Sequence, residues 1–166
     1  MNLLATFNEN PIEPTDYADR ETVKAIIIND NDEVLLFGSG LPGGGVEEGE
    51  TLEEALHREL MEEIGATIEI IRELGNVITY RDVLRKKYIF TGYYCQLVSL
   101  ARPTTTFENE IGVRLSWKNR EQTIRDMENH ILEVQTKGKE VFEGDRYQAH
   151  LFNTKTAIVF LKALDM

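Results

Sequence analysis

The sequence has 166 residues and a mass of 19.0 kDa, which fits one domain spanning residues 1–166. With 42% hydrophobic and 28% charged residues it has an ordinary globular composition, and no apolar run approaches the length of a membrane span. The single cysteine, Cys95, excludes an internal disulfide, and the first residues lack a secretory signal pattern, so we expect a cytoplasmic protein.

The net charge of −11 is unevenly distributed along the chain. Residues 44–66 hold eight glutamates and one arginine, which places −7 of the total in 23 residues. An acidic chain is not expected to bind nucleic acid in general, because the phosphate backbone repels it. The acidic segment itself therefore needs a chemical explanation.

The first predicted elements precede this segment. The β-branched run Val23–Asn29 reads as a strand, residues 29–32 (NDND) as a turn, and Val34–Phe37 as a second strand, which together predict a hairpin. A glycine-rich stretch, 38–45, follows. The segment Phe37–Leu41 is short, and we expect it to offer few contacts to a nucleobase.

A helix is predicted over Thr51–Ile64. Thr51 can cap its N-terminus, and Glu54, three residues later, completes the pattern of a capping box. Gly65 is a typical C-terminal stop.

Strands lie on both sides of this helix in the sequence and further helices follow them, which predicts an α/β (α+β) sandwich with a mixed β-sheet. We expect strands at Thr67–Arg81, Lys87–Leu100 and Ile111–Trp117, a loop at Pro103–Thr106, and helices at Glu121–Val134 and Gln148–Leu164. Arg81 and its basic neighbours at 85–87 are expected at a solvated hairpin end.

The acidic helix has the pattern of a metal site. On a helical wheel, Glu59, Glu62 and Glu63 share one sector, which borders the apolar stripe instead of opposing it. Like charges at this spacing cost roughly 0.2–0.5 kcal/mol per pair, and partial burial raises that cost. A divalent cation such as Mg²⁺ or Mn²⁺ removes the repulsion, since both prefer carboxylate and carbonyl oxygens. The alternative interpretation is a solvated acidic face.

Two neighbouring features favour the metal site. Residues 43–45 (GGG) let the backbone pass close to an ion, where a carbonyl can join the carboxylates. Arg58, beside Glu59, can orient carboxylates through paired hydrogen bonds, although an exposed ion pair on the helix is the simpler alternative.

These residues together resemble the Nudix box of the MutT-like pyrophosphohydrolases. Gly44, Glu50 and the run 58–65 (RELMEEIG) fit the pattern G-x5-E-x7-R-E-U-x-E-E-x-G-U, where U is a bulky aliphatic residue. The final U is Ala66 here, a departure that bears on packing and not on chemistry. The resemblance implies an α/β/α sandwich whose catalytic helix spans about 51–64.

The resemblance also implies an activity and its residues. It implies hydrolysis of a nucleoside diphosphate linked to another moiety, with Arg58, Glu59, Glu62 and Glu63 at the catalytic site. The divalent metals would be bound by the three glutamates and the Gly44 carbonyl. A further glutamate from a loop beyond the box is expected, and it is Glu110 or, as second choice, Glu108.

The implied reaction is attack of water on phosphorus, with metal ions neutralising the phosphoanhydride. Glu59, Glu62 or Glu110 could accept the proton from that water. The alternative function is a catalytically silent nucleotide-binding sensor or regulatory module on the same fold. Candidate substrates are nucleoside triphosphates, nucleotide sugars such as ADP-ribose, dinucleoside polyphosphates and 5′-triphosphate RNA.

The segments outside the box are assigned more coarsely. Residues 1–22 and 120–166 are candidates for the substrate pocket or for a homodimer interface. His57, His130 and His150 lack metal-ligand spacing, so ordinary surface or core roles are expected for them.

Overall fold

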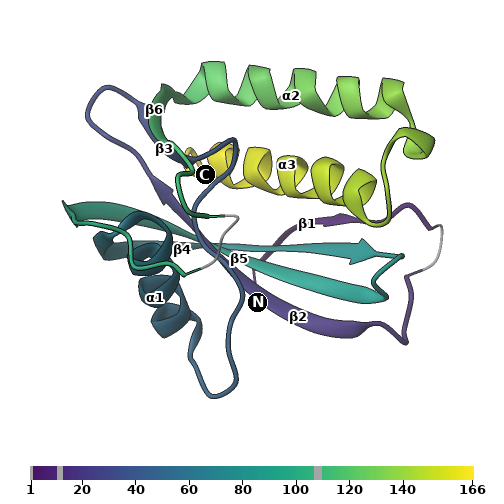
Figure 1. Ribbon diagram of the computed structural model, residues 1–166, viewed down its shortest axis with the longest axis horizontal. Coiled ribbons are helices and arrows are strands. Elements are labelled where there is room, and N and C mark those ends of the chain that lie inside the picture. The colour runs from purple at the N-terminus through teal and green to yellow at the C-terminus, as the bar shows by residue number, and fades with distance from the viewer. Residues whose placement is uncertain (1, 11–12, 107–109) are drawn as a thin grey trace.

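Nine regular elements and a short 3-10 helix, Lys139–Val141, make up the fold in the computed structural model, which describes residues 2–10, 13–106 and 110–166 (Figure 1). The strands are β1 (Leu3–Phe7), β2 (Ala18–Ile27), β3 (Glu33–Phe37), β4 (Ala66–Arg81), β5 (Lys86–Leu100) and β6 (Leu115–Asn119). The helices are α1 (Leu52–Ile64), α2 (Arg120–Lys137) and α3 (Arg146–Ala163).

The strands form two sheets. The larger sheet has the order β1-β4-β5-β2, in which β4 and β5 are antiparallel while β1 and β2 run parallel to their neighbours. The smaller sheet pairs β3 with β6 in antiparallel register, with Leu35 opposite Trp117. The predicted mixed sheet is therefore confirmed.

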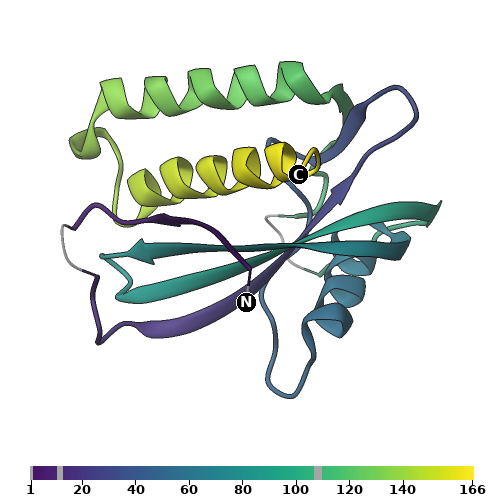
Figure 2. The same ribbon diagram turned by 180° about the vertical axis from the view of Figure 1, so that it is seen from behind.

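Helices cover both faces of the larger sheet. Helix α1 lies on one face, whereas α3 lies against the other face with α2 over it, and the view from behind shows the same layers (Figures 1 and 2). Alternation along β2 explains both cores, because Val23, Ala25 and Ile27 pack with α1 while Ile26 packs with Phe160 of α3. The predicted α/β/α sandwich is confirmed.

Helix α1 begins and ends where the sequence predicts. Thr51 accepts a hydrogen bond from the Glu54 amide, the Glu54 carboxylate accepts one from the Thr51 amide, and Gly65 caps the C-terminus in a left-handed conformation. Ala66, the departure from the box pattern, is buried in the core beneath α1. A small residue is therefore accommodated at this position.

The predicted hairpin of Val23–Asn29 with Val34–Phe37 forms only next to its turn. The Asn29 amide donates to the Glu33 carbonyl at 3.0 Å, and Ile28, directly after β2, forms an antiparallel bridge with Val34 of β3. The edge of β2 that a hairpin would use is paired with the glycine-rich loop instead. Strand β3 consequently pairs with β6.

Two further boundaries differ from the prediction. The strand expected at Ile111–Trp117 is β6, Leu115–Asn119, because Glu110–Gly112 form a turn in which Gly112 has a φ of 80°. Strand β1 was not predicted at all. It pairs in parallel with β4, which is so distant in the sequence that local residue patterns do not reveal the pairing.

Arg81 is also placed differently from the prediction. Its guanidinium is buried and forms an ion pair with Asp145, just before α3, while its face stacks on Tyr88 at 5.3 Å. Arg85 and Lys87 of this basic group pair with the exposed acids Asp16 and Asp19. Among the described helices, none is both long and apolar enough to cross a bilayer.

Candidate active site

The glycine-rich loop is held along the free edge of β2 by backbone hydrogen bonds. The amides of Val23 and Ala25 donate to the carbonyls of Gly44 and Pro42 at 2.9 and 3.0 Å, and Val46 donates to the Glu21 carbonyl at 3.1 Å. This pairing fixes the loop beside the C-terminal half of α1. The three glutamates predicted to bind metal lie on that half of the helix.

Two glycines allow the loop to contact these glutamates. A Cβ at Gly44 would lie 2.4 Å from the Glu59 carboxylate, so no other residue fits there without displacing that side chain. Gly43 has a φ of 122°, and its amide donates to the Glu63 carboxylate at 2.7 Å. The backbone at Gly43 and Gly44 therefore lies directly against the Glu63 and Glu59 carboxylates.

Arg58 connects the loop with the helix. Its guanidinium donates to both carboxylate oxygens of Glu50 at 2.6 and 2.9 Å and to the Gly45 carbonyl at 2.9 Å. It also reaches Glu59 at 2.9 Å and Glu62 at 3.2 Å. The Arg58 side chain is only 22% exposed, which distinguishes this network from the exposed helix pair that was the alternative.

The network separates the carboxylates into two electrostatic classes. Hydrogen bonds from Arg58 and from the Glu47 amide lower the pKa of Glu50 to about 2. Burial instead raises the pKa of Glu59, and it raises the pKa of Glu63 to about 7 despite the nearby Lys24 ammonium and the Gly43 amide. Glu50 is therefore held in its ionised form. At Glu59 and Glu63, the nearby cations do not offset the cost of burying the negative charge.

The loop after β5 brings a fourth carboxylate close to α1. The Thr105 amide donates to the Glu62 carbonyl at 2.9 Å, and the Thr105 hydroxyl hydrogen-bonds the Glu110 carboxylate. The charge of Glu110 contributes to the raised pKa of Glu63, which places the two carboxylates within electrostatic range. Glu108 lies outside the described residues.

The donor atoms near α1 are chemically suited to a hard divalent cation. Glu59, Glu62, Glu63, Glu110 and the Gly44 carbonyl offer only oxygen donors, which Mg²⁺ and Mn²⁺ prefer, but the described carboxylates are not drawn together around one point. The Gly44 carbonyl already accepts from Val23 but has a second lone pair. Among residues 2–10, 13–106 and 110–166, no three His, Cys, Asp or Glu side chains are gathered closely enough to form a metal cage.

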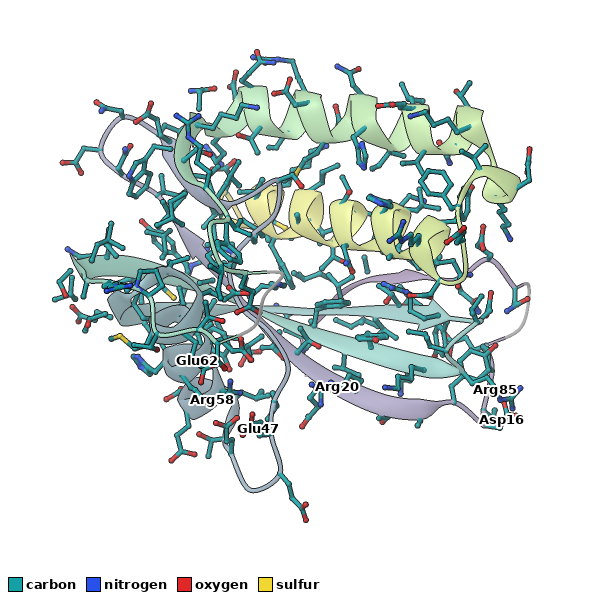
Figure 3. The ribbon with its side chains drawn as sticks, in the orientation of Figure 1. Asp16, Arg20, Glu47, Arg58, Glu62 and Arg85 are labelled. Atoms are coloured by element: carbon teal, nitrogen blue, oxygen red, sulfur yellow. The ribbon has the colours of Figure 1, made fainter. Side chains whose placement is uncertain are left out.

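The sequence reasoning missed two cations beside the site. Lys24 donates to the Leu41 carbonyl at 3.1 Å and to the Gly43 carbonyl, and burial lowers its pKa. A lone lysine inside the apolar strand VKAIII was an available signal. Arg20 lies beside the loop carrying Glu47 and donates to the Val46 carbonyl at 3.3 Å (Figure 3).

The sequence model of the NUDIX domain family matches residues 18–136 of the chain. This span includes every residue of the Arg58 network. The chain belongs to the NUDIX domain family. Helix α3 lies beyond the matched NUDIX residues.

Solved structures agree with the NUDIX fold. A NUDIX hydrolase from Nitrosomonas europaea superposes with a TM-score of 0.54 at 24% identity, covering 63% of this chain and 74% of that one. A MutT NUDIX hydrolase from Burkholderia pseudomallei gives 0.50 at 25% identity, covering 62% and 84%.

Curated relatives match over shorter stretches. An RNA pyrophosphohydrolase from Sulfurovum sp. (strain NBC37-1) is 49% identical over 55 residues, which are 31% of this chain and 35% of the relative. The nucleoside triphosphatase NudI from Enterobacter sp. (strain 638) is 36% identical over 88 residues, 49% of this chain and 61% of the relative. The chain therefore matches only about a third of the length of the RNA pyrophosphohydrolase.

Proposed function

We propose that the protein is a hydrolase that cleaves a phosphoanhydride bond in a nucleoside triphosphate or nucleotide derivative, with Mg²⁺ or Mn²⁺ as cofactor. The observation that carries this proposal is the Arg58 network, which holds Glu59 and Glu62 beside the glycine-rich loop. The family assignment supports it, as do the activities named for the RNA pyrophosphohydrolase and NudI relatives. A cytoplasmic location remains part of the proposal and is consistent with the buried free thiol of Cys95.

In this proposal, some residues position the site and others hold the metal ions. Glu50 fixes the guanidinium of Arg58, and Arg58 in turn orients Glu59 and Glu62 toward the loop. Glu59, Glu62, Glu63 and the Gly44 carbonyl would hold the metal ions, which supply charge neutralisation of the phosphates and acidification of a water. Without the cations, the same carboxylates repel a polyphosphate.

Glu59, Glu62 and Glu110 are the candidates for accepting the proton from the attacking water. Each of these carboxylates is described at the site, and each can accept a proton from water attacking phosphorus. Burial raises the pKa of Glu59, which makes that carboxylate a stronger base. The Glu110 carboxylate accepts a hydrogen bond from the Thr105 hydroxyl.

The test is an assay with Mg²⁺ and Mn²⁺ over a panel of nucleotides that includes 5′-triphosphate RNA, scoring phosphate against pyrophosphate release. Glu62→Gln removes one proposed metal ligand and should lower turnover by at least a hundredfold. Glu53→Gln is the matched control, because Glu53 is an exposed residue of the same helix, and it should leave turnover unchanged. Metal-independent turnover, or full activity of the Glu62 variant, contradicts the proposal and favours the silent sensor module.

A further inference from the structure

Four consecutive backbone carbonyls of the glycine-rich loop are all held from β2. The carbonyls of Pro42 and Gly44 accept from backbone amides of that strand at 3.0 and 2.9 Å. The alternate carbonyls, those of Leu41 and Gly43, accept from the side chain of Lys24 instead. A single ammonium, which has three donors, therefore completes the attachment of the loop to the strand.

The peptide between Gly43 and Gly44 needs a restraint of this kind. A Cβ at Gly43 would lie 2.3 Å from the Val23 carbonyl oxygen, and one at Gly44 would lie 2.4 Å from the Glu59 carboxylate. Close packing therefore excludes a side chain at either position. Two successive glycines also leave the peptide that they share free to rotate, because no Cβ limits the backbone dihedrals on either side of it. The close approach of the loop thus brings conformational freedom with it.

The contact with Lys24 removes that freedom, because the Gly43 carbonyl belongs to this peptide. On one side of the peptide, the Gly43 amide donates to the Glu63 carboxylate at 2.7 Å. On the other side lies the Gly44 carbonyl, the proposed metal ligand. Rotation of the peptide between them would move these two groups relative to each other and to the carboxylates of α1.

The position of Lys24 in β2 fits this role. It is the one charged residue of the run Val23–Ile28, and its side chain is partly buried. Burying a cation is unfavourable unless it is hydrogen-bonded or paired. The charges of Glu63 and Glu59 favour the ammonium form of Lys24 and so oppose the cost of burial. The two loop carbonyls and these charges together account for a lysine in an otherwise apolar strand.

We propose that Lys24 fixes the orientation of the Gly43–Gly44 peptide and thereby positions the glycine-rich loop against the carboxylates of α1. Lys24 is then a positioning residue and not a catalytic one, since its hydrogen bonds go to the loop. The effect on turnover rests on the proposed function, because it concerns the same site. The orientation of the loop can be measured without metal or nucleotide, so the two proposals can fail separately.

The first measurement uses the wild-type chain, isotope-labelled and free of metal and nucleotide. By NMR, we expect the Lys24 ammonium protons to exchange with water at least roughly tenfold more slowly than those of Lys118, which lies in an exposed ion pair. The Lys24 nitrogen should also show a coupling across the hydrogen bond to the Gly43 carbonyl carbon. Exchange as fast as at Lys118, without such a coupling, overturns the proposal.

The second measurement uses Lys24→Met, which keeps an unbranched apolar stem and removes the ammonium. The amide resonances of Gly43 and Gly44 should shift or broaden, while those of β1 stay unchanged. Because the loop and the carboxylates serve the chemical step, kcat for the best nucleotide should fall about 10- to 100-fold with little change in KM. Lys87→Met is the matched control. It removes a partly buried lysine from the neighbouring strand β5 and should leave the loop resonances and kcat unchanged.

Unchanged resonances of Gly43 and Gly44 in Lys24→Met overturn the proposal, and so does a fall in kcat without any change in the loop. If Lys24→Met does not fold, the proton exchange and the coupling in the wild type still test the contact. A restrained Lys24 ammonium in a protein that hydrolyses no nucleotide supports its hold on the loop and overturns the proposed function alone.

Discussion

Arg58 fixes the geometry of the site at the scale of single residues. Its guanidinium forms a paired contact with Glu50 and single contacts with Glu59 and Glu62. Glu59 and Glu62 lie on the helix of Arg58, whereas Glu50 precedes that helix, so the arginine ties the loop to the helix. The sequence spacing predicted an orienting role, but the contact with the Gly45 carbonyl required the folded loop.

Arg58→Lys tests whether this planar contact matters beyond its charge. Lysine keeps the charge but cannot form the paired contact with Glu50, so Glu59 and Glu62 lose their orientation. We expect kcat/KM for the best nucleotide to fall about 10- to 100-fold, as for other groups that orient metal ligands. Arg125→Lys, at an exposed pair on α2, serves as the control and should retain full activity.

Cys95 gives a prediction about pH. Its thiol is fully buried, and burial raises its pKa from 9.0 to about 12. The unfolded chain therefore loses the thiol proton at lower pH than the folded chain, and the stabilising effect of the neutral thiol is present below pH 9 and lost between pH 9 and 12. Relative to Cys95→Ala, the wild type should lose roughly 1 kcal/mol of unfolding free energy by pH 10.

Urea denaturation of both proteins at pH 7, 8, 9 and 10 measures this difference. A constant difference between the two proteins across the series would contradict the prediction. The same burial should keep Cys95 unreactive toward a thiol reagent in native protein at pH 8 and fully reactive in denaturant.

Helix α1 is the element that the sequence specified most completely. Its apolar stripe, capping box and C-terminal glycine are local signals, and each one forms as predicted. The glutamates at the border of the stripe are partly buried because the helix presents them at the edge of its contact with the sheet. Local pattern and tertiary packing agree in this element.

Thr51→Ala should destabilise the protein through α1. The change removes the hydroxyl that accepts from the Glu54 amide, and loss of such a cap costs about 1 kcal/mol. For a chain of this size, we expect the melting temperature to fall by about 2–4 °C in a calorimetric or circular dichroism melt. Thr136→Ala, which removes an exposed hydroxyl bonded to the Leu132 carbonyl late in α2, should change it much less.

The pairing of the free edge of β2 depends on residues outside the strand. Its sequence predicts a strand, but not whether β3 or the glycine-rich loop occupies its free edge. The loop pairs there through Val23 and Ala25, and β3 pairs with β6. The segment that hydrogen-bonds to a strand edge is determined by the packing of distant parts of the chain.

The charge distribution is a property of the whole molecule. The segment 44–66 contributes −7 of the net −11, and two of its glutamates, Glu59 and Glu63, have pKa values raised mainly by burial. Repulsion among these carboxylates opposes folding, and a bound divalent cation would relieve it. The proposed metal binding would therefore be coupled to stability.

Adding Mg²⁺ or Mn²⁺ should raise the melting temperature. At ten times the dissociation constant, binding to the folded state alone contributes about 1.4 kcal/mol, and chelator should reverse the effect. Sodium chloride at equal ionic strength should stabilise the protein less, because screening affects all charges alike. If Glu59→Gln showed the same metal-dependent shift as wild type, the assignment of Glu59 as a ligand would be wrong.

The sequence by itself determined the box, helix α1 with its caps, the long strands β4 and β5, and the sector that holds Glu59, Glu62 and Glu63. These features follow from spacing within short segments, where the period of the helix or strand fixes which side chains share a face. The folded protein decided the rest, because it depends on contacts between distant segments: the loop on the edge of β2, Lys24 against the carbonyls of that loop, and Glu110 near Glu63.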